Sequence, residues 1–248
     1  DEHDCLVSSS ATGLMKISNS PLAFADDNFL DTSECAELIA FAKARADPGE
    51  TYDVQIPPEQ SEVMASIMRR VSVLCGSAPH PGEPTPVVRN TPPNRELEGG
   101  RWMNRGLHLD TNGNPFRCAT ILVYLSDVSI DGATVFPCGG NTAQPSTREA
   151  GAALARKGIT AAIPGRQRGD QEAGALEKTL IAAAASFEGF SVYPKAGRLL
   201  LFYPLLDDGG ADPYSWHGGA AVGNGPGDGK WLLQIFKTVP NDSRSKSD

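Results

Sequence analysis

Residues 116–128, FRCATILVYLSDV, decide the fold that the sequence predicts. The run is short, rich in branched and aromatic side chains, and bounded by polar residues, which is typical of a buried β-strand. Four later runs share the pattern: GATVFP (132–137), FSVYP (190–194), GRLLLFYPL (197–205) and GKWLLQIFKTVP (229–240). Short strands separated by Gly, Pro, Asp and Asn indicate an antiparallel β-sandwich or barrel.

Two helices are expected ahead of these strands. In residues 29–49 the apolar positions recur with helical spacing, and Asp31 and Glu34 stand where a capping box would begin the helix. In residues 61–76 a second apolar stripe ends at Gly76, which can terminate a helix. Each helix has one apolar face and therefore needs a sheet to cover.

The length of 248 residues suits a single domain spanning the whole chain. Within it, residues 22–84 are expected to be mainly helical support and residues 85–239 to form the β core. An Ala- and Gly-rich insertion at about residues 139–188 interrupts that core and is expected to be partly helical and partly disordered. Residues 240–248 are polar and predict a disordered tail.

Composition narrows the classes of function. The formal charge of -8, with no basic stripe, argues against a nucleic-acid partner. No apolar run approaches the roughly 18 residues of a membrane span, so the chain as given is expected to be soluble, in the secretory pathway, including the endoplasmic reticulum, or in the cytoplasm. The five cysteines form no C-x-x-C zinc pattern, although one or two disulfides remain possible. Nothing in the sequence indicates an oligomeric state.

His108 and Asp110 raise the question of a metal site. They stand two residues apart just before the run at 116–128, and side chains at i and i+2 of a strand point to the same side. The spacing alone is equally typical of a solvated strand end, so a third ligand is needed. His217 is the best third ligand because antiparallel strands can bring it to the mouth of a barrel. Two histidines and one carboxylate would form the facial triad of non-haem iron enzymes.

Eight motifs follow one another along the chain: FLDTSECAELI, VVRN, HLD, RCATILVYLSDV, GATVFP, VYPKAGRLLLFYPL, DPYSWHGG and GKW. Their order resembles the prolyl 4-hydroxylase branch of the iron(II)- and 2-oxoglutarate-dependent dioxygenases, over nearly the whole chain apart from the insertion and the tail. The resemblance implies an α+β fold with a double-stranded β-helix (jelly-roll, cupin-like) core and N-terminal supporting helices. The long, partly helical insertion would be an addition to that core.

The resemblance also implies roles for individual residues. His108, Asp110 and His217 would be the catalytic iron ligands. Lys230, immediately before a tryptophan, would hold the far carboxylate of 2-oxoglutarate, with support from the hydroxyl of Thr134. Arg117 matches an arginine that lies near the peptide groove in relatives, and an exposed strand-end charge is the other interpretation.

One part of the family pattern is missing. Relatives carry Y-x-x-G-x-x-Y-x-x-H-x-D, whose first tyrosine helps to bind 2-oxoglutarate, whereas Asn90 occupies that position here and a longer loop follows. A cosubstrate contact is therefore absent or replaced, and Trp102 is a candidate for the replacement and for a substrate contact. The change lies at the mouth of the expected site, so it bears on the substrate more than on the chemistry.

By resemblance, the activity is hydroxylation of prolyl residues in a peptide or protein, as in a procollagen-proline 4-dioxygenase. Iron(II), 2-oxoglutarate and O2 would be required, 2-oxoglutarate would be converted to succinate and CO2, and ascorbate would serve as reductant. A free amino acid or small metabolite is the alternative substrate. From another class, a cupin-like metal-binding module or hydrolase without oxygenase activity would also use His and Asp.

Overall fold

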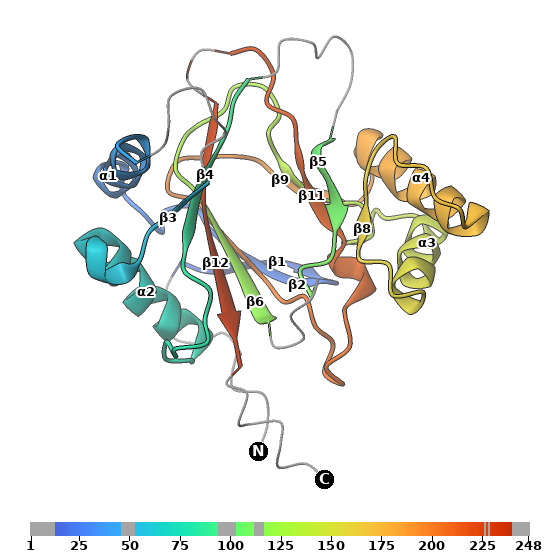
Figure 1. Ribbon diagram of the computed structural model, residues 1–248, viewed down its shortest axis with the longest axis horizontal. Coiled ribbons are helices and arrows are strands. Elements are labelled where there is room, and N and C mark those ends of the chain that lie inside the picture. Colours follow the sequence, from blue (N-terminus) through green and yellow to red (C-terminus); the bar gives the residue numbers. More distant parts are fainter. Residues whose placement is uncertain are drawn as a thin grey trace.

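The computed structural model describes residues 13–45, 53–93, 103–111, 117–225, 227 and 229–239. In this part the strands form two antiparallel sheets that face each other, and helices lie outside both (Figure 1). The described helices are α1 (Thr32–Lys43), α2 (Glu62–Cys75), α3 (Pro145–Arg156) and α4 (Gln171–Ala185), with short 3-10 helices η1 (Pro58–Gln60) and η2 (Pro213–Ser215). Each is too short or too polar to traverse a lipid bilayer. The expected tail at residues 240–248 lies outside the described residues.

The larger sheet has the strand order β1-β2-β10-β6-β12-β4-β3. Its strands are β1 (Met15–Asn19), β2 (Leu22–Asp26), β3 (Asp53–Gln55), β4 (Val87–Thr91), β6 (Arg117–Tyr124), β10 (Leu199–Phe202) and β12 (Lys230–Thr238). β6 and β12 lie side by side, with Leu232 opposite Tyr124 and Phe236 opposite Thr120. Alternate residues of both strands face the helices, and those between them face the smaller sheet.

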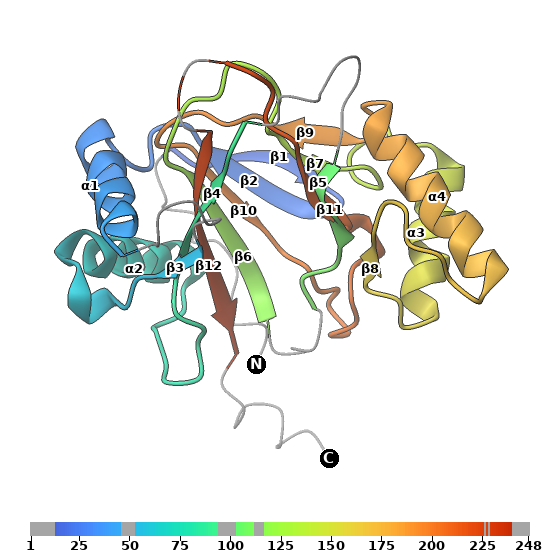
Figure 2. The ribbon, with the colours of Figure 1, turned by 45° about the horizontal axis from the view of Figure 1, so that its top comes forward.

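α1 and α2 pack on the outer face of the larger sheet, on the side away from the smaller sheet (Figure 2). The capping box expected at the start of α1 is present, with Asp31 and Glu34 each accepting the other's backbone N–H. Gly76 follows α2 in the left-handed conformation, at φ 61°, and ends it as expected. The helical stripes share one apolar core with residues of the sheet such as Val123 and Leu233.

The smaller sheet has the strand order β8-β5-β11-β7-β9. Its strands are β5 (Met103–His108), β7 (Thr134–Phe136), β8 (Ala161–Ala162), β9 (Phe190–Val192) and β11 (His217–Ala220). Between the two sheets lies a second apolar cluster, in which Phe136 meets Phe202 edge to face with ring centroids 5.1 Å apart. This cluster borders the candidate site, because Phe136 and Phe202 also contact the ring of His217.

The insertion at residues 139–188 is ordered by a core of its own. All of these residues are described, so the expected disordered part is not found. α3 and α4 pack on each other and on the outer face of the smaller sheet (Figure 2), and Leu154, Leu180 and Trp216 are fully buried between them and the sheet. β8, which joins the two helices, pairs with β5 so that Ala161 lies opposite His108. The alanine-rich sequence hides this core because small residues pack closely without a strong apolar pattern.

The four cysteines among the described residues, Cys35, Cys75, Cys118 and Cys138, form no disulfide. Cys5 lies outside the described residues. The fold in this part is therefore held by apolar packing and hydrogen bonding without a disulfide.

Gly106 in β5 is expected not to tolerate alanine because β8 runs against it. A Cβ there would lie 2.5 Å from the carbonyl oxygen of Ala162. We expect Gly106→Ala to displace β8 and to speed hydrogen exchange at the amide of Leu109, which donates to Thr160 O at 2.9 Å. Gly174→Ala in α4, where a Cβ meets nothing within 4 Å, is the control and should stabilise that helix by up to about 1 kcal/mol. Unchanged exchange at Leu109 in the first variant would contradict the expectation.

Candidate active site

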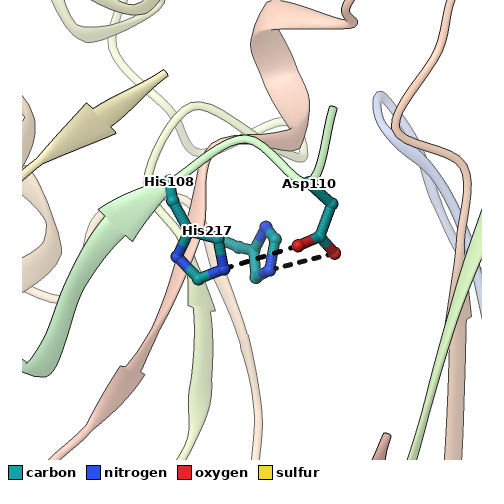
Figure 3. A group of neighbouring side chains, drawn as sticks. All are labelled: His108, Asp110 and His217. Carbon is teal, nitrogen blue, oxygen red and sulfur yellow. Dashed lines mark ion pairs between the residues drawn. The ribbon is translucent and has the colours of Figure 1, made fainter. Parts of the chain in front are cut away.

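His108, Asp110 and His217 converge between the two sheets (Figure 3). His217 on β11 lies directly opposite His108 on β5, and Asp110 follows β5 by two residues. The Nε2 atoms of His108 and His217 each lie 3.5 Å from a different carboxylate oxygen of Asp110. One donor atom from each residue lies within 4.8 Å of the others, so the three can reach one metal ion.

Backbone contacts fix both imidazoles. Nδ1 of His217 is 2.9 Å from the carbonyl oxygen of Ser215, and Nδ1 of His108 is 3.3 Å from that of Gly106. In each ring this contact favours a proton on Nδ1 and leaves the lone pair of Nε2 directed toward Asp110. The strand geometry therefore presents two metal-binding nitrogens to one carboxylate.

Asp110 is also held in place by hydrogen bonds. It is buried, with 3% exposure. The hydroxyl of Thr120 on β6 donates to Oδ2 at 2.7 Å. Nη1 of Arg117 donates to the backbone carbonyl of Asp110 and lies 3.6 Å from Oδ1. The contact with β6 thus ties the end of β5, in the smaller sheet, to the larger sheet.

The electrostatics of the three residues suit metal binding. Burial lowers the pKa of His217 to about 4, despite the neighbouring charge of Asp110, so this ring is neutral at pH 7. Burial of Asp110 opposes its ionisation, but interaction with the protonated form of His217, the charge and hydrogen bond of His108, and the hydrogen bond from Thr120 outweigh it and hold the pKa of the carboxyl below its ordinary value. For His108, burial lowers the pKa and the contact with Asp110 raises it, with a net rise. Two nitrogen donors and one oxygen anion are the ligand set that non-haem iron(II) accepts.

A cavity that is partly open to solvent extends from the two histidines between the sheets. Its wall includes Lys230 and Thr134, the two residues expected to hold the far carboxylate of 2-oxoglutarate. Both are buried, at 4% and 3% exposure. Nζ of Lys230 donates to the carbonyl oxygen of Gly132 at 2.8 Å. The cavity presents a buried cation and a hydroxyl together.

Tyr124 lies behind the wall of the cavity and contacts Thr134. Its side chain is fully buried, and its hydroxyl lies 2.7 Å from Oγ1 of Thr134 and 3.0 Å from the carbonyl oxygen of Val192. Burial raises the pKa of Tyr124 to about 12, so the phenol keeps its proton. When the phenol donates to Thr134, the hydroxyl proton of Thr134 can point to a ligand in the cavity.

Arg117 and Trp102, the residues expected to contact substrate, stay predictions in that role. Arg117 is mostly buried, with its guanidinium 3.5 Å from the ring centroid of Phe236, and in this structure its hydrogen bond goes to Asp110. It therefore holds a member of the triad in place. Trp102 lies outside the described residues, and its contacts to substrate or cosubstrate stay a prediction.

Asn90 stands at the position where the family pattern carries a tyrosine. Asn90 lies opposite Trp231, is 4% exposed, and does not line the cavity; its amide is 3.5 Å from the carbonyl oxygen of Lys230. Its neighbours Arg89 and Thr91 line the cavity instead. Sequence reasoning missed both because the alternation of β4 is fixed by its register with β12, in which Thr91 lies opposite Lys230.

Comparisons with known proteins agree with this architecture. No protein-family model matches the chain. The chain is 28% identical over 234 residues to "Probable prolyl 4-hydroxylase 8" of Arabidopsis thaliana, covering 87% of this chain and 70% of that protein. It is 27% identical over 248 residues to "Prolyl 4-hydroxylase 2" of the same plant, covering 92% and 72%.

Among solved structures, the viral collagen prolyl hydroxylase of Paramecium bursaria Chlorella virus-1, determined as a 2OG complex, superposes with a TM-score of 0.54 at 17% identity. The match covers 90% of this chain and 99% of the viral one. At this identity the likeness shows the fold alone: two antiparallel sheets in the jelly-roll arrangement that the sequence predicted.

Thr120 is expected to contribute to metal affinity although it cannot reach a metal bound by the triad. Thr120→Val keeps the shape of the side chain and removes the hydrogen bond to Oδ2 of Asp110. We expect the affinity for Co2+, followed by its absorption spectrum, to fall by about 10- to 100-fold. Thr179→Val is the control, because the hydroxyl of Thr179 bonds only within α4, to Ala175 O. Equal affinities in the two variants would show that Thr120 plays no such part.

Proposed function

We propose that this chain, which is prolyl 4-hydroxylase-like in sequence and fold, is an iron(II)- and 2-oxoglutarate-dependent dioxygenase that hydroxylates prolyl residues in a peptide or protein. One observation carries the proposal. The two histidines of the triad, which meet Asp110 beside the cavity, share that cavity with a buried lysine, Lys230. A molecule with a metal-chelating end and a distant carboxylate matches both features.

His108, Asp110 and His217 are the proposed iron ligands. Their donor set fits iron(II), and the cavity beside the histidines leaves room for further ligands. Thr120 and Arg117 keep the carboxylate of Asp110 in place, and the contacts of the two imidazoles with backbone carbonyls keep their Nε2 atoms turned toward it. The chain therefore presents a preorganised site and does not have to assemble it on binding.

Lys230 and Thr134 are the proposed contacts of the far carboxylate of 2-oxoglutarate. Asp110 bonds to Thr120 of β6, and Thr120 lies opposite Phe236, near the end of β12. Lys230 is the first residue of β12. The lysine therefore lies away from the triad along the sheet, as a ligand with charged groups at both ends requires. A carboxylate also compensates the cost of burying the ammonium.

When bound, iron and 2-oxoglutarate supply the oxidising power: 2-oxoglutarate is decarboxylated to succinate and CO2, and O2 gives one oxygen atom to succinate and one to a C–H bond of the substrate. The residues of the chain bind and orient these molecules, and they exclude water. Apolar side chains such as Leu122 and Leu232 line the cavity between the triad and Lys230 and limit the access of water there. Ascorbate is the proposed reductant that restores iron(II) after turnovers without substrate.

The proposed enzyme works as one domain. Helical support in residues 22–84 precedes a β core at residues 85–239, and the insertion at residues 139–188 stands beside the strand that carries His108. The proline-containing substrate would approach from the open side of the cavity.

Loss of a ligand is expected to abolish turnover. His108→Ala or Asp110→Ala removes a metal donor at the end of a strand, so the fold should persist while succinate release from 2-oxoglutarate and the gain of one oxygen by a proline-rich peptide both stop. Succinate assays, mass spectrometry and thermal unfolding check this together. Asp207→Ala, an exposed loop position, is the control for Asp110→Ala.

Two outcomes would contradict the proposal. Turnover retained in either ligand variant would exclude the metal assignment. Bound iron without any succinate release by the unaltered chain, across proline-rich peptides and free amino acids, would favour a metal-binding module or hydrolase.

Removal of the buried cation should raise the requirement for 2-oxoglutarate. For Lys230→Ala we expect the KM for 2-oxoglutarate to rise by about 10- to 100-fold, because a hydrogen bond to a charged group contributes about 1.5–3 kcal/mol. Lys178→Ala, on the exposed side of α4, is the control. An unchanged KM in the Lys230 variant would show that another group binds the far carboxylate.

A further inference from the structure

Arg89 is a cationic residue of the cavity to which the proposed reaction gives no task. It lies on β4, opposite Leu232 of β12, and lines the same cavity as His108 and Lys230. Its side chain is 29% exposed, so it stands where the wall of the cavity meets solvent. In a chain with a net charge of -8, a second cation at this cavity marks a place for an anion.

The partner of Arg89 in this structure is Asp53, directly opposite it on β3, the edge strand of the larger sheet. Nε of Arg89 lies 2.6 Å from Oδ1 of Asp53. The carboxylate is 47% exposed, and ion pairs this accessible to water are weak. Arg89 can therefore exchange Asp53 for another carboxylate at little cost.

The position of Arg89 separates it from the proposed contacts of 2-oxoglutarate. The two charged ends of the cosubstrate are assigned to the triad and to Lys230 with Thr134. Arg89 lies on β4, the strand next to that of Lys230, and two residues from Thr91, which is opposite Lys230. Its ion pair with Asp53 directs the guanidinium toward β3 at the edge of the sheet. An anion that meets Arg89 there belongs to a different molecule.

We infer that Arg89 binds a carboxylate of the molecule that is hydroxylated. The inference rests on the proposed function and adds a substrate class to it: peptides with an acidic side chain, or a free C-terminal carboxylate, next to the target proline. A guanidinium suits this task because its fork of donors matches a carboxylate bidentately. Asp53 pairs with Arg89 in the absence of substrate and therefore competes with the carboxylate of the substrate for Arg89.

The test compares short peptides that differ in one group beside the proline: glutamate, glutamine, a free C-terminal carboxylate, or its amide. We measure kcat/KM from the hydroxylated product, and binding to the Co2+-loaded protein from the fluorescence anisotropy of labelled peptides. The unaltered chain should prefer at least one carboxylate peptide over its neutral counterpart by about 10-fold. The glutamate and C-terminal arms identify the source of the carboxylate.

Two variants should shift that preference in opposite directions. Arg89→Gln should reduce the ratio of carboxylate to neutral peptide to about one by weakening only the carboxylate peptide. Asp53→Asn removes the competitor and should increase the ratio. Arg69→Gln, on the exposed face of α2, loses the same charge elsewhere and should leave the ratio as it is.

Three results would overturn the inference. They are an unaltered chain that does not distinguish the peptides, an Asp53→Asn variant with a lower ratio, and an Arg89→Gln variant with an unchanged ratio but a raised KM for 2-oxoglutarate. The last would assign Arg89 to the cosubstrate. If Arg89→Gln fails to fold, the Asp53→Asn arm still decides. A failure of the proposed function itself is distinguishable, because succinate release would then be absent with every peptide while the anisotropy comparison remains measurable.

Discussion

Burial of one carboxylate, that of Asp110, is the constraint on which the rest of the site depends. A charged group with 3% exposure is costly unless charges or hydrogen bonds compensate it. Two imidazoles, the hydroxyl of Thr120 and the guanidinium of Arg117 surround this carboxylate. These groups come from both sheets, so the need to compensate one charge also fixes how the end of β5 sits against β6.

The pairing of the smaller sheet supplies the other half of this arrangement. His108 and His217 face each other because β5 and β11 pair in the register that places them opposite, and β8 pairs with the free side of β5. α3 contributes through Trp216, the residue before His217, whose indole N–H donates to Gly151 O at 3.1 Å. The inserted helices thus contact the strand of one histidine and the neighbour of the other, which makes them part of the site's scaffold.

Local sequence signals predicted much of this molecule. The capping box at Asp31, the stop at Gly76, the strand runs and the jelly-roll class are confirmed, because each depends on residues close together in the sequence or on the ordered motifs. The meeting of His217 with His108 and Asp110 was also predicted, from the shortage of other histidines and the motif order. Residues whose role depends on register were missed. Neither Arg89 nor Thr91 was identified, because one step along a strand decides which side chain enters the cavity, and no residue within the strand reveals that choice.

Arg117 and the insertion show a second limit of sequence reasoning. The guanidinium of Arg117 bonds to the backbone carbonyl of Asp110, seven residues earlier, a contact that no local sequence signal indicates. The order of the insertion comes from Leu154 and Leu180 packing beneath Trp216, a contact between distant segments. Both features arise from tertiary contacts that only the folded chain brings together.

β8 has a further consequence for the behaviour of the molecule in solution. It spans two residues, and it pairs with Leu107 and His108 at the end of β5, which would otherwise present unpaired N–H and C=O groups at the margin of the sheet. Such a margin can recruit a strand from a neighbouring molecule and seed association. The α3–α4 pair, by holding β8 in place, therefore keeps this end of β5 from pairing with a strand of another molecule.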